Sequence, residues 1–134
     1  MKPEAQAWFK IAHEDMAAAE QLLQSSIYRM VCLHSQQAVE KTLKALLTER
    51  GVEFKRTHNI VDLLSLLSAQ GLPVDVSHEE AGFLNAVYRS RYPAEAGLLP
   101  QGEPTTDDAR KALALGRKVL AQGQRLLEQR GSRT

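Results

Sequence analysis

Apolar residues near the amino terminus recur at alternating steps of four and three positions, which places them on one side of an α-helix. This stripe consists of Ala5, Phe9, Ala12, Met16, Ala19 and Leu23. Pro3 suits the first turn of such a helix, because its missing N–H group has no helical partner there. The pattern predicts a long first helix with a narrow apolar seam, as in a bundle of nearly parallel helices.

A second helical pattern runs from about Ile27 to Arg50 and stops at Gly51, a residue suited to the left-handed position after a helix. Its apolar positions cover more than half of the helix circumference. They are Tyr28, Val31, Cys32, Ala38, Val39, Thr42, Leu43, Ala45, Leu46 and Leu47. Because one neighbour cannot cover so wide an arc, the helix must be central in its own bundle or lie against another copy of the chain, and we expect both.

A third, shorter pattern follows a polar loop. Asn59 is placed to cap this helix, and Gly71 and Pro73 are placed to end it. Its apolar positions are Ile60, Leu63, Leu64 and Leu67.

Ser77 and Glu80 have the spacing of a capping box, so a fourth helix should begin there. Pro93 is expected to end it, because the residue before a proline disfavours the helical conformation. The inner side of this helix should present Ala81, Leu84 and Tyr88.

The segment 93–105 has three prolines, two glycines and no periodicity, which is long for a connection inside a domain and indicates a functional or mobile segment. Thr105 and Asp108 then supply the cap and first-turn acid of a last helix. Its apolar stripe is Ala112, Leu113, Gly116, Val119, Leu120, Gly123, Leu126 and Leu127. Gly116 and Gly123 indicate either close approach by a neighbouring backbone or simple tolerance of glycine.

No segment shows the alternation of a β-strand, so the sequence predicts an all-α fold, an up-and-down four-helix bundle with an additional short helix. With 134 residues, of which 43% are hydrophobic, the chain is expected to form one domain over residues 1–134, with a frayed tail from about residue 130. The net charge of +1 excludes a strong overall attraction for polyanions. Cys32 has no disulfide partner, and neither a signal peptide nor a membrane-spanning run is found, so we expect a cytoplasmic protein.

The segment "HSQQAVEKTLKALL", residues 34–47, places much polar chemistry on the second helix. Gln36 lies on the apolar side, so its amide should be buried and must find hydrogen-bond partners. The opposite strip consists of Gln37, Glu40, Lys41, Lys44 and Thr48. Glu40 and Lys44 form an i,i+4 pair, which is equally typical of a solvated face and of a functional one.

The segment "YRSRYP", residues 88–93, presents two arginines near the end of the fourth helix. Arg89 and Arg91 point about 200° apart on a regular helix and so cannot form one clamp. The helix dipole accounts for Arg89. Arg91 continues the inner face and needs a partner or a cleft, and Glu40 is the internal partner that we expect.

The four histidines have no short metal-binding spacing, and a single cysteine cannot complete a zinc site, so neither a metal nor another cofactor is expected. His58 precedes a helix start, where its ring is typically a local hydrogen-bonding group, and His34 is typical of a surface or an interface. Either could still act as an acid or base. The absence of a glycine-rich phosphate loop or an acidic magnesium cluster excludes self-contained phosphoryl transfer.

Trp8, "HSQQAVEKTLKALL", "THNIVDLL", "SRYP" and the threonine-led last helix resemble, in this order, the HEPN domain family of bacteria and archaea. The resemblance covers nearly the whole chain. It implies a homodimeric helical bundle, often encoded beside a minimal nucleotidyltransferase in a two-component, toxin-antitoxin-like system. The RYP sequence resembles the branch proposed to bind a nucleotide or to present a substrate to its partner.

Some relatives in this family are ribonuclease toxins, in which an arginine is followed after four to six residues by a histidine. Arg89 and Arg91 match the arginine of that motif, but residues 92–97 hold no histidine. Metal-independent RNA cleavage needs a group that moves the proton of the 2′-hydroxyl, so the resemblance leaves catalysis undecided.

The leading hypothesis is therefore a binding module that holds a nucleotide or an RNA phosphate for a separately encoded nucleotidyltransferase. The cleft is expected to contain Arg91, Arg89, Tyr92, Lys44 and His58, supported by Gln36, Gln37 and Glu40. In a second hypothesis the same cleft is a ribonuclease site, in which His58 or Tyr92 replaces the missing histidine. In a third, the chain is an interaction scaffold whose arginines form internal salt bridges.

Overall fold

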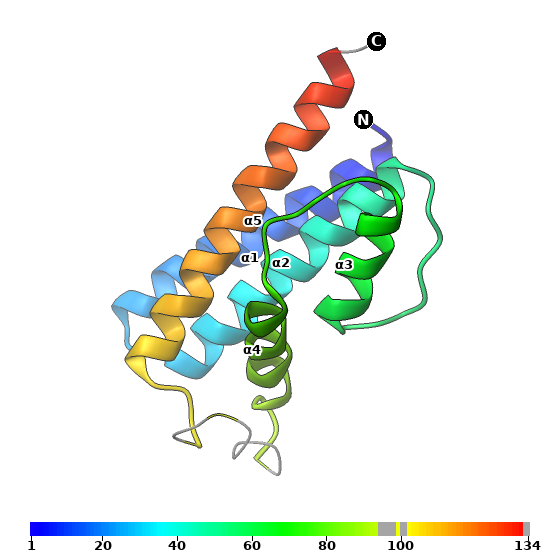
Figure 1. Cartoon of the computed structure of the whole chain (residues 1–134). Coiled ribbons are helices and arrows are strands. Elements are labelled where there is room, and N and C mark those ends of the chain that lie inside the picture. The colour runs from blue at the N-terminus through cyan, green and yellow to red at the C-terminus, as the bar shows by residue number, and fades with distance from the viewer. Residues whose placement is uncertain (94–98, 100–101, 133–134) are drawn as a thin grey trace.

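The computed structural model describes residues 1–93, 99 and 102–132 and shows five helices with no strand in this part of the chain (Figure 1). The helices are α1 (Pro3–Gln24), α2 (Tyr28–Glu49), α3 (Ile60–Ala69), α4 (His78–Arg89) and α5 (Thr106–Ser132). The all-α prediction is confirmed. Residues 133–134 of the expected frayed tail, and most of the proline-rich segment, lie outside the described residues.

The three long helices form the body of the molecule, as Figure 1 shows. α1 and α2 form an antiparallel hairpin joined by a short turn, in which Ser26 has a φ of 59°. α5 packs along α2, and the shorter α3 and α4 cover another side of α2. None of the described helices is both long and apolar enough to cross a membrane.

α2 is the central element, because all four other helices pack on it. Its buried residues are Val31, Cys32, Ser35, Gln36, Ala38, Val39, Glu40, Thr42, Leu43, Lys44, Ala45, Leu46 and Leu47. The prediction that it is central in its own bundle is confirmed. Its contact with a second copy of the chain stays a prediction.

The glycines of α5 lie where this helix approaches its neighbours closely. A β-carbon added at Gly123 would lie 2.4 Å from Cγ2 of Thr42 on α2, and one at Gly116 would lie 2.7 Å from Cε of Met16 on α1. Real β-carbons essentially never come so near another heavy atom, so both glycines lie at close contacts. The nearest atoms belong to side chains rather than to a neighbouring backbone, whose closest atom is the Ser35 carbonyl oxygen, 3.4 Å from the β-carbon position at Gly116.

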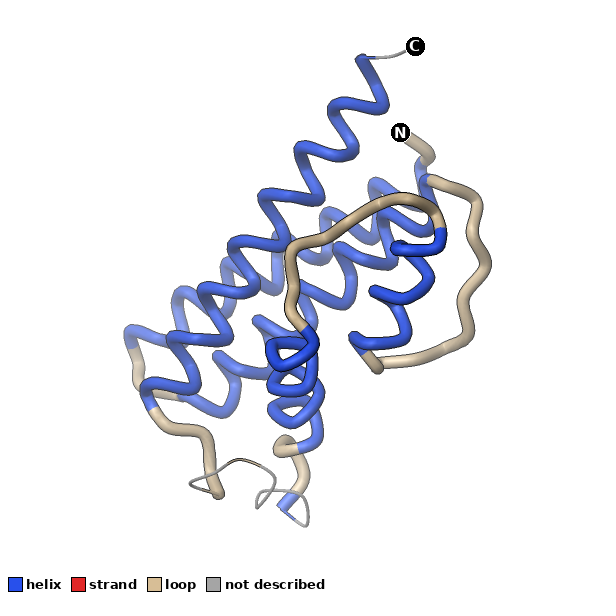
Figure 2. Tube along the Cα trace, viewed as in Figure 1, coloured by secondary structure: helices blue, strands red, loops and turns tan. Residues whose placement is uncertain are grey.

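Loops and caps follow the sequence signals closely. The Asn59 side chain accepts a hydrogen bond from Val61 N at the start of α3, and Ser77 and Glu80 form the capping box of α4. The two loops that flank α3 run across the surface (Figure 2). Gly51 ends α2 with a φ of 70°, a backbone conformation that favours glycine.

The end of α4 differs from the prediction, because the helix stops at Arg89 rather than continuing to Pro93. Two side-chain contacts close it early. Ser90 Oγ donates to the carbonyl of Val87 at 2.7 Å, and Arg29 Nη1 donates to the carbonyl of Ser90. Arg91 therefore lies in a turn after the helix instead of on its inner face.

Candidate functional site

A buried carboxylate on α2 organises the polar residues expected at the site. Glu40 is 2% exposed, and its Oε2 accepts a hydrogen bond from Nζ of Lys44 at 2.9 Å. Its Oε1 contacts Nδ1 of His58 at 3.0 Å and Nε2 of Gln36 at 3.3 Å. The interpretation of Glu40 and Lys44 as a solvated pair is wrong, because the loop before α3 and the amino-terminal part of α1 cover this side of α2.

Lys44 lies behind the carboxylate and is only 7% exposed. Its ammonium group lies 5.4 Å from the ring centre of Trp8 and 5.9 Å from that of Phe54. Aromatic faces stabilise a cation in this position. The structure therefore places Lys44 as the counter-charge of Glu40, out of direct reach of a ligand in solvent.

Gln36 and Gln37 extend this network, and the prediction that Gln36 is buried with hydrogen-bond partners is confirmed. Gln36 Nε2 donates to Glu40 and to the carbonyl of His58, the latter at 3.4 Å. Gln37 Nε2 donates to Gln36 Oε1 at 2.6 Å. Both amides therefore support Glu40 and the segment that holds His58.

The contact with Glu40 fixes which nitrogen of the neutral His58 ring carries the hydrogen. An ionised carboxylate only accepts hydrogen bonds, so Nδ1 of His58 must be the nitrogen that donates. In the neutral ring, Nε2 is then the nitrogen with a free lone pair. Because the His58 side chain is exposed, this lone pair is available to a ligand.

Four planar groups follow one another in contact, beginning with the His58 ring that Glu40 holds. We call them the stacked column: His58, Tyr88, Arg91 and Tyr92. The His58 and Tyr88 rings stack with their centres 4.6 Å apart. Cζ of Arg91 lies 3.7 Å from the centre of the Tyr88 ring and 4.1 Å from that of Tyr92. The Arg91 guanidinium thus lies against two aromatic rings.

The polar contacts of Arg91 differ from the prediction. Its Nη1 donates to the carbonyl of Tyr88 at 2.7 Å, and its Nη2 donates to the hydroxyl of Tyr92 at 3.1 Å. The prediction that Glu40 is its internal partner is wrong, because the carboxylate already binds His58 and Lys44 and the early end of α4 turns Arg91 back onto Tyr88.

Tyr88 is the member of the column that sequence reasoning did not assign to the site. Burial raises the pKa of its hydroxyl above the ordinary value, the charge of Arg91 lowers it, and Glu40 and Tyr92 add to the rise. The phenol is therefore neutral near pH 7. Its position three residues before Arg91, a spacing at which helical side chains meet, was the signal that could have revealed it.

Two further contacts set the position of the column relative to the bundle. Asn85 on α4 accepts a hydrogen bond from Ile60 N and donates to Asn59 Oδ1, both at 2.9 Å. This joins the start of α3, next to His58, to α4. Arg29 holds the other end through Ser90 and forms an ion pair with Glu103 at 3.1 Å.

The Arg89 side chain is exposed and has no hydrogen bond or ion pair with any described residue. It lies two residues before Arg91, at the carboxyl end of α4. Its charge is therefore available in solvent beside the stacked column.

A second histidine, carboxylate and lysine cluster lies where α1 packs on α2. Nδ1 of His34 contacts Oδ1 of Asp15 at 2.9 Å, and Nζ of Lys41 contacts Oδ2 at 2.8 Å. His34 and Arg29 do not converge, because Arg29 turns to the end of α4.

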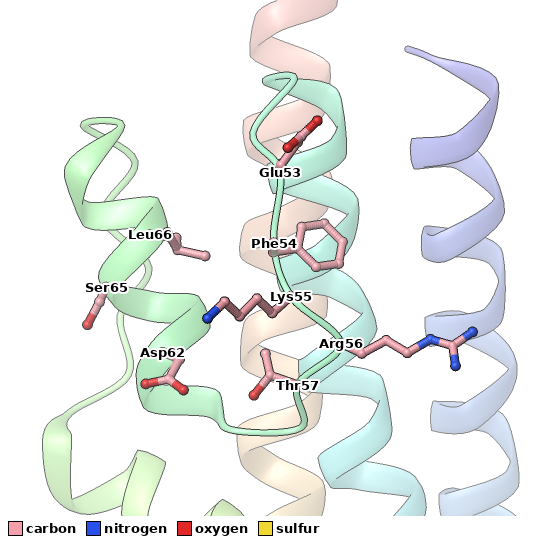
Figure 3. A pocket seen from close by; sticks show the side chains of 8 residues that line it. All are labelled: Glu53, Phe54, Lys55, Arg56, Thr57, Asp62, Ser65 and Leu66. Carbon is pink, nitrogen blue, oxygen red and sulfur yellow. The ribbon is translucent and has the colours of Figure 1, made fainter.

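A cavity of about 650 Å³ lies between the loop before α3 and α3 itself. Figure 3 shows Lys55 extending from this loop toward α3, while Phe54 and Arg56 point to the opposite side. The cavity reaches Thr57, the residue before His58, but does not include the stacked column. Among the described residues no group of three or more His, Cys, Asp or Glu side chains could hold a metal ion.

Comparison with known proteins identifies relatives of the whole bundle. The model of the HEPN domain family matches residues 5–126. The structure is similar to that of TT1696 from Thermus thermophilus, with 28% identity and a TM-score of 0.69 over 92% of this chain and 98% of that one. It is also similar to ST0689, an archaeal HEPN homologue, with 24% identity and a TM-score of 0.63 over 92% and 97% of the two chains. No curated protein matches.

Proposed function

Because the chain belongs to the HEPN domain family, we propose that it is a nucleotide- or RNA-binding module in which the edge of the Arg91 guanidinium binds a phosphate. The observation behind this proposal is the contact of the Arg91 guanidinium with two aromatic rings, which hold it in place. Nη1 and Nη2 each donate one hydrogen bond within the protein, so the second N–H of each and the N–H of Nε remain for a ligand. In-plane donors suit the two oxygens of a phosphate, which guanidinium groups bind in a bidentate manner.

The surroundings of Arg91 support an anionic ligand. Arg91 has no ion pair with a described residue, and the exposed Arg89 lies close in sequence. The internal salt bridges assumed in the scaffold hypothesis are absent from both side chains within the described residues. Their positive charge is thus not neutralised by the part of the protein that the structure describes.

Calorimetric titration with a nucleoside monophosphate and with a short RNA tests this proposal. The Arg91→Ala variant should lose about tenfold or more in affinity, since a charge-assisted bidentate contact is lost. Arg89→Ala is the matched control and should lose about threefold or less, because an exposed flexible arginine contributes mainly long-range attraction. Equal losses in the two variants would contradict the specific role of Arg91.

The same proposal includes a homodimer that works beside a separately encoded minimal nucleotidyltransferase, as the family resemblance implies. Light scattering after gel filtration tests the dimer and should give twice the chain mass of 14.9 kDa. Co-expression with a nucleotidyltransferase encoded next to the chain, followed by affinity purification, tests the partner. Recovery of each protein alone would count against the pair.

One observation favours ribonuclease activity as a second candidate function. The exposed ring of His58 is held by Glu40 with Nε2 as the free base, which is the arrangement needed to take a proton from a 2′-hydroxyl. RNA cleavage in the presence of a chelator, abolished in His58→Ala and retained in His34→Ala, is the expected result of this mechanism. Tight binding of uncleaved RNA by the wild-type protein supports the binding module alone.

A further inference from the structure

Tyr92 ends the stacked column with an exposed aromatic surface. One face of its ring packs on the Arg91 guanidinium, yet the residue is 55% exposed. The other large hydrophobic residues that are exposed in the described part of the chain, Met1, Ile11 and Ile27, are aliphatic. Tyr92 is therefore the aromatic side chain of that part that offers a large surface to solvent.

We propose that the free face of Tyr92 is a stacking site for a nucleobase, and this proposal rests on phosphate binding at Arg91. The ligand is then a nucleotide, or the nucleotide of a strand, whose base lies on Tyr92 and whose phosphate lies at the edge of Arg91. Base and phosphate of one nucleotide are held by neighbouring layers of the column. Phosphate alone, or a sugar phosphate, fills only half of the site.

The contacts of Tyr92 favour stacking over donation by its hydroxyl. The hydroxyl oxygen accepts a hydrogen bond from Arg91 Nη2 at 3.1 Å, which holds it toward the column rather than toward a ligand. The ring is thus positioned by two contacts with the same guanidinium, one to its face and one to its hydroxyl. An aromatic ring that is already positioned loses little conformational freedom when a base stacks on it.

The column also connects this surface to the rigid core. His58 is bound to Glu40, which is buried on α2, and each further layer packs on the one before it. The orientation of the Tyr92 ring therefore depends on the central helix. Every base has a flat face, so such a platform accepts any base, and it favours purines because their rings overlap a larger area.

The test compares three ligands by calorimetry: adenosine 5′-monophosphate, ribose 5-phosphate and adenosine. With the wild-type protein, the monophosphate should bind about tenfold more tightly than ribose 5-phosphate, the range expected for one base on one aromatic ring. Tyr92→Phe, which keeps the ring, should retain this preference. Tyr92→Leu should lose this preference, and its affinity for ribose 5-phosphate should also fall by about threefold, because Arg91 loses a ring contact.

The outcomes separate this inference from the proposed function. Equal binding of adenosine monophosphate and ribose 5-phosphate by the wild-type protein, or an unchanged preference in Tyr92→Leu, would overturn the base platform but leave the phosphate site intact. Adenosine binding that depends on the Tyr92 ring, without any binding of ribose 5-phosphate, would support the platform and overturn the phosphate site. Thermal unfolding of both variants checks that the substitutions at this exposed position leave the fold intact.

Discussion

The central helix contributes to two clusters in different surroundings, each made of a carboxylate, a histidine and a lysine. In the first, Glu40 binds His58 and Lys44, and both charged side chains of the Glu40–Lys44 pair are almost fully buried. In the second, Asp15 binds His34 and Lys41, and the Asp15 and Lys41 side chains are 12% and 19% exposed.

What differs most is the neighbourhood of each histidine. His58 stacks on Tyr88 and through it lies next to a guanidinium, whereas no such stack is found at His34 among the described residues. The second cluster joins α1 to α2, so its role in the fold is complete without a ligand. Similar hydrogen bonds thus serve two purposes, and the adjacent arginine and tyrosines distinguish the candidate site from the structural cluster.

The two clusters should differ most in how much the free energy of unfolding falls when the charge of their carboxylate is removed. Glu40→Gln leaves the Lys44 ammonium buried without a counter-charge, which should lower the free energy of unfolding by about 3 kcal/mol. Asp15→Asn should cost only about 1 kcal/mol, because Lys41 and His34 can turn toward water. Urea denaturation measures both, and equal losses would show that burial does not distinguish the clusters.

Removing each histidine separates their contributions to binding. His58→Ala should weaken the binding of a nucleoside monophosphate by about fivefold to tenfold, since Tyr88 and Arg91 lose the layer on which they rest. His34→Ala should leave the affinity unchanged. The measurement is calorimetry at one salt concentration, and a loss in His34→Ala as large as that in His58→Ala would place the ligand elsewhere on α2.

The stack itself can be tested at Tyr88. Tyr88→Leu keeps an apolar side chain but removes the ring between His58 and Arg91, so the guanidinium loses a cation–π contact of about 0.5–1 kcal/mol. We expect a loss of nucleotide affinity of about twofold to fivefold, which corresponds to a contact of that energy. Tyr28→Leu, at the start of α2, is the comparison variant and should leave the affinity unchanged. An unchanged affinity in Tyr88→Leu would show that Arg91 is positioned by its hydrogen bonds alone.

The smallest expected effect is on the dependence of stability on pH. Burial raises the pKa of Tyr88, so between the ordinary tyrosine value and the raised value the folded chain keeps a proton that the unfolded chain has lost. The contribution of Tyr88 to the free energy of unfolding is therefore complete below about pH 10. It is lost as the pH rises toward the pKa of Tyr88 in the folded chain. In the Tyr88→Phe variant, the free energy of unfolding measured by urea denaturation should fall less at alkaline pH. A fall identical to that of the wild-type protein would contradict the raised pKa of Tyr88.

The helices and several local contacts could be predicted from the sequence. The capping box at Ser77 and Glu80, the cap at Asn59 and the burial of Gln36 follow from short-range spacing, because the interacting groups lie within about one helical turn. The end of α4 was missed because Arg29, 61 residues away from Ser90, takes part in closing it.

The candidate site could be predicted only in part, for the same reason. The sequence alone determined the all-α fold, the family and the residue types near the site, since periodicity and motifs are properties of neighbouring positions. Tertiary structure decided that Glu40 and Lys44 are buried, that Glu40 binds His58 rather than Arg91, and that Arg91 contacts two aromatic rings. These pairings join α2, the loop before α3 and the end of α4, and a helical pattern does not specify which faces of separate elements meet.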